Sequence, residues 1–101
     1  MSSIAVVGSM TTGHDACPPV PVIEGIGWIT IDGVPVTAVG CRCQGHSCED
    51  HGYHVPIISD GAPFILAEGI RLARVGDPVQ WGGCPSPHCI ATGIDWISIS
   101  D

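Results

Sequence analysis

An internal repeat is the feature of this sequence that most restricts how the chain can fold. A segment that starts at Gly25 recurs 36 residues later, starting at Gly61. The matching pairs are Gly25 and Gly61, Trp28 and Phe64, Ile29 and Ile65, Asp32-Gly33 and Glu68-Gly69, and Val39-Gly40 and Val75-Gly76. Repetition of this kind indicates that each copy is one supersecondary unit.

A third copy is divided between the two ends of the chain. It begins at Gly93 and stops after what would be its first strand, residues 94–99. Its second half matches residues 4–8, which resemble 36–40 and 72–76. We therefore expect a single domain, residues 1–101, of three units with pseudo-threefold symmetry, in which one unit takes its returning strand from the N-terminus.

Each unit has the pattern of a β-hairpin. Residues 28–31 are all aromatic or β-branched, as is typical of a strand. Asp32-Gly33 is a strong two-residue turn signal, and residues 34–39 form the returning strand. The copy around Glu68-Gly69 repeats this pattern more weakly. No window shows an apolar stripe at helical spacing, so the expected fold class is all-β with minimal helix.

The charge balance excludes several classes of partner. The formal net charge is -7, and the only strong cations are Arg42, Arg71 and Arg74. Nucleic acids and anionic membranes both need a basic patch, so neither is expected as a partner. The apolar run at residues 4–7 lacks the features of a signal peptide, and no stretch approaches the roughly 20 apolar residues of a membrane span. No stable membrane anchoring is expected.

Three connecting segments, 8–25, 40–61 and 76–93, contain all five histidines and all six cysteines. Symmetry would bring these segments together at one end of the domain. The spacings Cys43-x-x-His46 and Cys48-x-x-His51 suit a tetrahedral zinc ion, and a metal can order loops that have few apolar residues. The sequence therefore predicts a metal site where the connecting segments meet.

Two other interpretations of the cysteines stay open. Six cysteines could form three disulfides in a secreted binding module, although interleaved histidines and the lack of a signal peptide favour metal ligation. A small zinc hydrolase or deaminase would need an open coordination position and a His-x-Glu pattern with Cys-x-x-Cys, which the chain lacks. We expect no enzymatic activity.

The chain resembles the PAAR-repeat family over essentially its whole length. The residues that carry the resemblance are the closing motif at 73–77, Ala-Arg-Val-Gly-Asp, its copy at 33–40, and Cys48-x-x-His51-Gly52. The family's proline-alanine-alanine-arginine tetrad is degenerate here: residues 70–74 keep only the final Ala-Arg, and residues 34–38 keep the proline.

The resemblance implies a small cone that caps the blunt end of a trimeric β-helical spike, one tip per trimer, in a type VI secretion system or a contractile phage tail. It implies a piercing role, attachment of the broad base to a spike of the valine-glycine-repeat type, and effector cargo in some systems. The chain would be a bare tip with no effector extension, cytoplasmic before assembly and then secreted or injected with the spike. It also implies a structural zinc near the apex, held by three histidines and one cysteine. A cone has little interior volume at its apex, so a metal would order what apolar packing cannot.

The expected ligands are His14, His46, His51 and Cys84. His14 and His46 each lie six residues past a matching glycine, Gly8 and Gly40. His51 belongs to the Cys-x-x-His-Gly element, and Cys84 follows Gly82-Gly83 near where the family places a cysteine. Four protein ligands would make the site structural. Cys43, Cys48, His54 or Cys89 could replace one of them, and nickel or iron could replace zinc.

Several other residues carry structural expectations. Cys17, Cys41 and Cys89 are expected to be small packing residues, His88 to be exposed, and Asp77 to organise the turn after Val75-Gly76. The aromatic residues at the repeated position, Trp28, Phe64 and Trp96, are expected in the core or at the base, with anchoring of the spike as the functional alternative.

Overall fold

The computed structural model describes residues 2–12, 19–45, 53–63, 65–80 and 88–99. These residues form short β-strands and no helix, which confirms the expected all-β class. The strands are β1 (Ser2–Ile4), β2 (Ile26–Ile31), β3 (Val34–Val36), β4 (Ile57–Ile58), β5 (Leu66–Ala67), β6 (Ile70–Arg71), β7 (Pro78–Gln80), β8 (His88–Cys89) and β9 (Ile94–Ile99).

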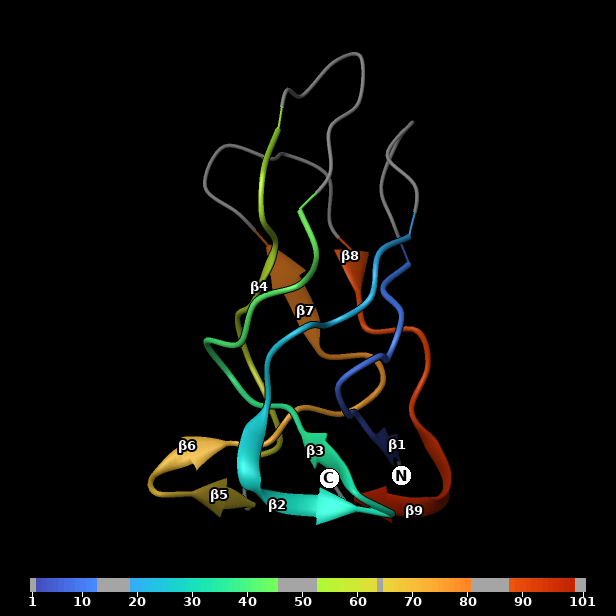
Figure 1. Ribbon diagram of the computed structural model, residues 1–101, viewed down its shortest axis with the longest axis vertical. Coiled ribbons are helices and arrows are strands. Elements are labelled where there is room, and N and C mark those ends of the chain that lie inside the picture. Colours follow the sequence, from blue (N-terminus) through green and yellow to red (C-terminus); the bar gives the residue numbers. More distant parts are fainter. Residues whose placement is uncertain (1, 13–18, 46–52, 64, 81–87, 100–101) are drawn as a thin grey trace.

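Two antiparallel hairpins and a third antiparallel strand pair lie at one end of the molecule, together with both chain termini (Figure 1). β2 pairs with β3, β5 pairs with β6, and β1 pairs with β9, with Ser2 opposite Ile99. Asp32 and Glu68 both have φ 52°, and the glycines after them have φ 82° and 83°. Two successive positive φ values match the twist of a hairpin, which explains the acid-glycine pair in both turns. The hairpins expected at Asp32-Gly33 and Glu68-Gly69 are confirmed, and the first described strand pairs with the last.

The strand that returns from each hairpin continues into a closed ring of three segments, residues 4–6, 36–38 and 72–74. The antiparallel pairs are Ile4 with Arg74, Val6 with Val36, and Ala38 with Leu72. Three backbone hydrogen bonds complete the circuit: Ala5 N–H donates to Ala73 C=O at 3.0 Å, Ala73 N–H to Thr37 C=O at 2.9 Å, and Thr37 N–H to Ala5 C=O at 3.2 Å. None of these three residues is exposed to solvent.

The same backbone bonds recur where each ring segment leaves the ring. The N–H groups of Val7, Val39 and Val75 donate to the carbonyls of Pro35, Arg71 and Ser3 at 2.9, 2.9 and 2.8 Å. The glycines that follow, Gly8, Gly40 and Gly76, donate to Val22, Ile58 and Ile90, each at 2.8 Å. We call these three places junctions, because each one links a hairpin to the connecting segments.

The connecting segments are not the plain loops that the sequence predicted. Six short pieces of them pair in a second closed ring: 10–12 with 20–22, 20–22 with 42–44, 42–44 with 56–58, 56–58 with 78–80, 78–80 with 88–90, and 88–90 with 10–12. β4, β7 and β8 belong to this upper ring, which lies beyond the hairpins in Figure 1. Closure gives every piece two neighbours, so the ring has no free strand edge.

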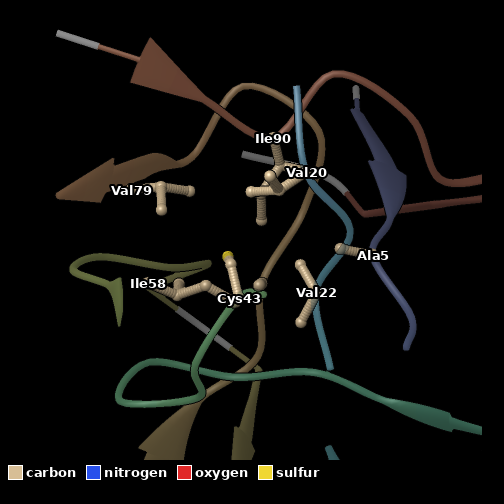
Figure 2. Packing of buried hydrophobic residues seen from close by; sticks show 8 residues of the cluster. Ala5, Val20, Val22, Cys43, Ile58, Val79 and Ile90 are labelled. Atoms are coloured by element: carbon tan, nitrogen blue, oxygen red, sulfur yellow. The ribbon is translucent and has the colours of Figure 1, made fainter. Parts of the chain in front are cut away.

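The apolar interior has two parts, one inside each ring. The lower cluster contains Ile4, Val6, Val36, Ala38, Ala62, Ala67 and Leu72. The upper cluster contains Ala5, Val20, Val22, Cys43, Ile58, Ala73, Val79 and Ile90. Figure 2 shows side chains of the upper cluster pointing toward one another, with the sulfur of Cys43 among them. Alternate residues of the connecting segments therefore build a core of their own.

Candidate functional site

All four expected metal ligands, His14, His46, His51 and Cys84, lie outside the described residues, as do Cys17 and Cys48. Among the residues that the structure describes, no group of three His, Cys, Asp or Glu side chains could hold a metal ion. The geometry near the expected site is therefore described from the residues that adjoin these ligands in the sequence.

The segments on either side of the expected ligands are hydrogen-bonded to one another. Thr12 N–H donates to Cys89 C=O at 2.8 Å, and Cys89 N–H donates to Thr12 Oγ1 at 3.1 Å. Gln44 N–H donates to Pro21 C=O at 2.8 Å, and Ile57 pairs with Gln80. Each connecting segment is thus tied to another within the upper ring, a few residues in sequence from the expected ligands.

The candidate replacement ligands in the described part differ in their surroundings. Cys43 is completely buried in the upper cluster, and burial raises the pKa of its thiol to about 11, with a smaller contribution from Cys41. Its side chain is part of the upper cluster, so the described residues show a packing role for Cys43. Cys41 and Cys89 are half-buried, and His54 is buried. Cys41 packs against both apolar clusters, consistent with its expected structural role.

The expectation that His88 is exposed was wrong, because only 6% of its surface is accessible. Strand alternation places His88 of β8 on the same side as Ile90, which follows β8 and is fully buried. Val20 and Pro56 occupy the matching places two residues before Val22 and Ile58, and both are buried as well. The spacing of two residues between His88 and Ile90 was the signal that could have placed this histidine inside.

Trp28 is not a core residue, since 65% of its surface is exposed. The lower cluster is filled by smaller aliphatic side chains, with Ile29 and Ile31 of β2 packed against it. Alternation along β2 then leaves Trp28 on the outer face. Leu66 of β5 and Ile70 of β6 are also exposed, at 56% and 42%. Phe64 lies outside the described residues. The hairpin end therefore presents an apolar outer surface.

All three arginines are paired with carboxylates. Arg42 binds Glu24 at 2.9 Å, Arg71 binds Asp60 at 3.0 Å, and Arg74 binds Asp77 at 3.1 Å. The side-chain bond from Arg42 lowers the pKa of Glu24, and the backbone N–H of Gly61 together with Arg71 lowers the pKa of Asp60. Asp77 also accepts the Arg74 backbone N–H, which confirms that it organises its turn.

No protein-family model matches the chain, and no curated protein matches it. In the described part, no helix is long and apolar enough to cross a membrane.

Proposed function

We propose that the chain is a metal-stabilised conical tip that caps the trimeric spike of a contractile injection apparatus and helps to pierce the target envelope. The apparatus would be a type VI secretion system or a phage tail, as the resemblance to PAAR-repeat proteins implies. The role is mechanical, with no catalytic step. The protein would be cytoplasmic before assembly and then leave the cell with the spike.

The observation that carries the proposal is the closed circuit of hydrogen bonds through Ala5, Ala73 and Thr37. Three strands that pair in a circle, each continuing into an equivalent junction, support a pseudo-threefold axis through the two rings. A monomer with such an axis can match a trimer end to end, because each of its units meets an equivalent part of one spike subunit. One tip per trimer is the expected stoichiometry.

The base of the tip would be the outer surface of the hairpin end. Trp28 and Leu66 are the exposed apolar side chains of β2 and β5, and an exposed apolar surface commonly marks an interface. Tryptophan is prominent among residues that dominate interface energies. The turn residues Asp32 and Glu68 would add negative charge around this surface.

A structural metal ion, zinc or another first-row metal, would lie at the other end. His14, His46, His51 and Cys84 would hold it, and their imidazole and thiolate groups suit zinc. The segments around Thr12, Gln44 and Gln80 support this site, since they pair within one ring and precede His14, His46 and Cys84 in the sequence by two to four residues. When bound, the metal would crosslink three segments above a core that is already filled.

Binding to a trimeric spike end tests the interaction. The purified chain and the spike trimer are expected to form a complex of one tip and one trimer in light scattering. Trp28→Ser is expected to weaken this complex strongly, whereas Tyr53→Ser, which removes another highly exposed aromatic residue, should not. Tyr53 belongs to the connecting segment beside Gly45, so it is a matched control. Absence of any complex, or equal weakening by both variants, would contradict the proposal.

Metal analysis tests the proposed metal site. Protein purified without added metal is expected to contain one metal ion per chain. His14→Ala, His46→Ala, His51→Ala and Cys84→Ser should each lower the metal content and the melting temperature, because a structural metal contributes directly to folding. Cys41→Ser should retain the metal. Metal-free protein in which thiol titration finds no free cysteines would instead support the disulfide-stapled module.

A further inference from the structure

One junction of the fold carries a hollow beside the β5–β6 hairpin. Its volume is about 440 Å³, and it is lined by Val39, Ser59, Asp60, Gly69, Ile70 and Arg71. Val39 N–H donates to Arg71 C=O, and Gly40 N–H donates to Ile58 C=O, so the hollow lies where β6 meets the upper ring. Gly69, Ile70 and Arg71 belong to the hairpin of β5 and β6, so the hollow borders the hairpin end.

The side chains at this junction differ from those at the other two. Pro35 and Ser3 take the place of Arg71 at the junctions of Val7 and Val75, as the shared hydrogen bonds show. Glu24 matches Asp60 in the repeat, but it pairs with Arg42 of a connecting segment and not with a hairpin strand. Among the three described junctions, only this one joins an acid and a guanidinium across a hairpin and a connecting segment.

The Asp60–Arg71 pair keeps groups available for a ligand. Both hydrogen bonds to Asp60, from Gly61 N and Arg71 Nη1, end on the same oxygen, Oδ1. Within the described part of the chain, Oδ2 accepts no hydrogen bond and Arg71 donates only through Nη1. The two side chains are 58% and 50% exposed. An ionised acceptor beside spare guanidinium donors matches a group that has an N–H and a C=O side by side.

We propose that this hollow binds an extended, uncharged peptide segment of a second protein. An amide of that segment would donate to Asp60 Oδ2 and accept from Arg71, and an apolar side chain would contact Val39 and Ile70. The charges of Asp60 and Arg71 balance, so an amide is a better match than a carboxylate or an ammonium group. A hollow of this size accommodates one or two side chains, which suits a short segment. The hollow borders the proposed base through Ile70, so peptide binding is tested on the chain without the spike.

Amide chemical shifts of the full-length ¹⁵N-labelled chain test the proposal. The probe is the neutral peptide acetyl-Leu-Asn-Val-amide, compared with the same peptide carrying Asp or Lys in place of Asn. Saturable shifts are expected at Val39, Ser59, Gly69 and Ile70. Asp60→Asn and Arg71→Gln should each weaken binding about fivefold or more, the effect of losing one hydrogen bond. Glu24→Gln and Arg42→Gln alter the exposed pair at another junction and should leave affinity unchanged.

Three outcomes would overturn the proposal: no saturable shift at these amides, tighter binding of a charged peptide, or equal weakening by the Glu24 and Asp60 variants. Asp60→Asn retains the oxygen that accepts Gly61 N–H, so its fold should persist, and its spectrum without peptide checks this. Trp28→Ser should bind the peptide normally, which separates failure here from failure of spike docking.

Discussion

The carboxylate of Asp77 accepts two hydrogen bonds from Arg74, one from its backbone N–H at 2.8 Å and one from its Nε–H at 3.1 Å. The Asp77 and Arg74 side chains are only 7% and 18% exposed, so water cannot readily replace either bond. The pair closes the turn that leads from the lower ring into β7. It is the most buried of the three arginine–carboxylate pairs.

Asp77→Ala is expected to lower the free energy of unfolding by about 3 kcal/mol, because it removes the shared acceptor of the Arg74 backbone N–H and Nε–H. Denaturant titration measures this loss. Glu24→Ala removes the corresponding acid from an exposed pair and should have a much smaller effect. Equal losses of unfolding free energy in the two variants would contradict the prediction that the buried Arg74–Asp77 pair contributes more to stability than the exposed Arg42–Glu24 pair.

Substitution of Gly61 by alanine is expected to be strongly destabilising. A Cβ at Gly61 would lie 2.6 Å from the carbonyl oxygen of Leu72, and Gly25 is equally close to the oxygen of Val36. The ring backbone would have to move, at a cost of about 1–3 kcal/mol. Gly27→Ala is the control, since nothing lies within 4 Å of a Cβ there. Thermal unfolding of Gly61→Ala and Gly27→Ala at similar temperatures would contradict the prediction.

Cys41→Ser is expected to stabilise the fold slightly. Ser9 and Asp77 each donate their backbone N–H to the residue three positions earlier, and their side chains accept the N–H of Val6 and Arg74. Cys41 makes the same backbone bond, to Ala38, but sulfur is a weak acceptor. A serine hydroxyl should contribute roughly 0.5–1 kcal/mol in denaturant unfolding. Cys41→Ala is the control, and a serine variant less stable than the alanine variant would refute the analogy.

Alkaline pH is expected to weaken the fold through Cys43. The pKa of this thiol is raised by burial from 9.0 to about 11, so between these values the folded chain retains a proton that the unfolded chain releases. Stability must therefore fall as pH rises through this window, by at most about 1.4 kcal/mol per pH unit. Denaturant unfolding of the wild type and of Cys43→Ala, from neutral pH to about pH 11, measures the difference in slope. Parallel curves would mean that Cys43 ionises equally in both states.

Much of the hairpin end could be predicted from the sequence, and most of the upper ring could not. Asp32-Gly33 and Glu68-Gly69 mark turns because both residues need positive φ, and the divided third copy predicted that β1 pairs with β9. The upper ring is built from pieces of about three residues, which are too short for alternation to stand out. For the same reason His88 was expected outside, although it alternates with Ile90.

The candidate metal site shows a second limit to what could be predicted from the sequence. Ligand types and spacings predict a metal, but a local pattern does not determine which donors converge when they come from three separate segments. Trp28 illustrates the corresponding problem for surfaces. Its apolar character is equally compatible with a core and with an exposed interface, and only the packing of Ile29 and Ile31 against the lower cluster shows which face it takes.

The pairing of Ser2 with Ile99 has a consequence for how the protein is made. A ribosome produces β1 before the other strands of the described part and β9 after them, so β1 has no neighbour in this pair until those strands have been made. A nascent chain can form the β2–β3 turn early, but it cannot pair β1 with β9 until β9 has been made. The first described strand is therefore among the last to find its place during synthesis.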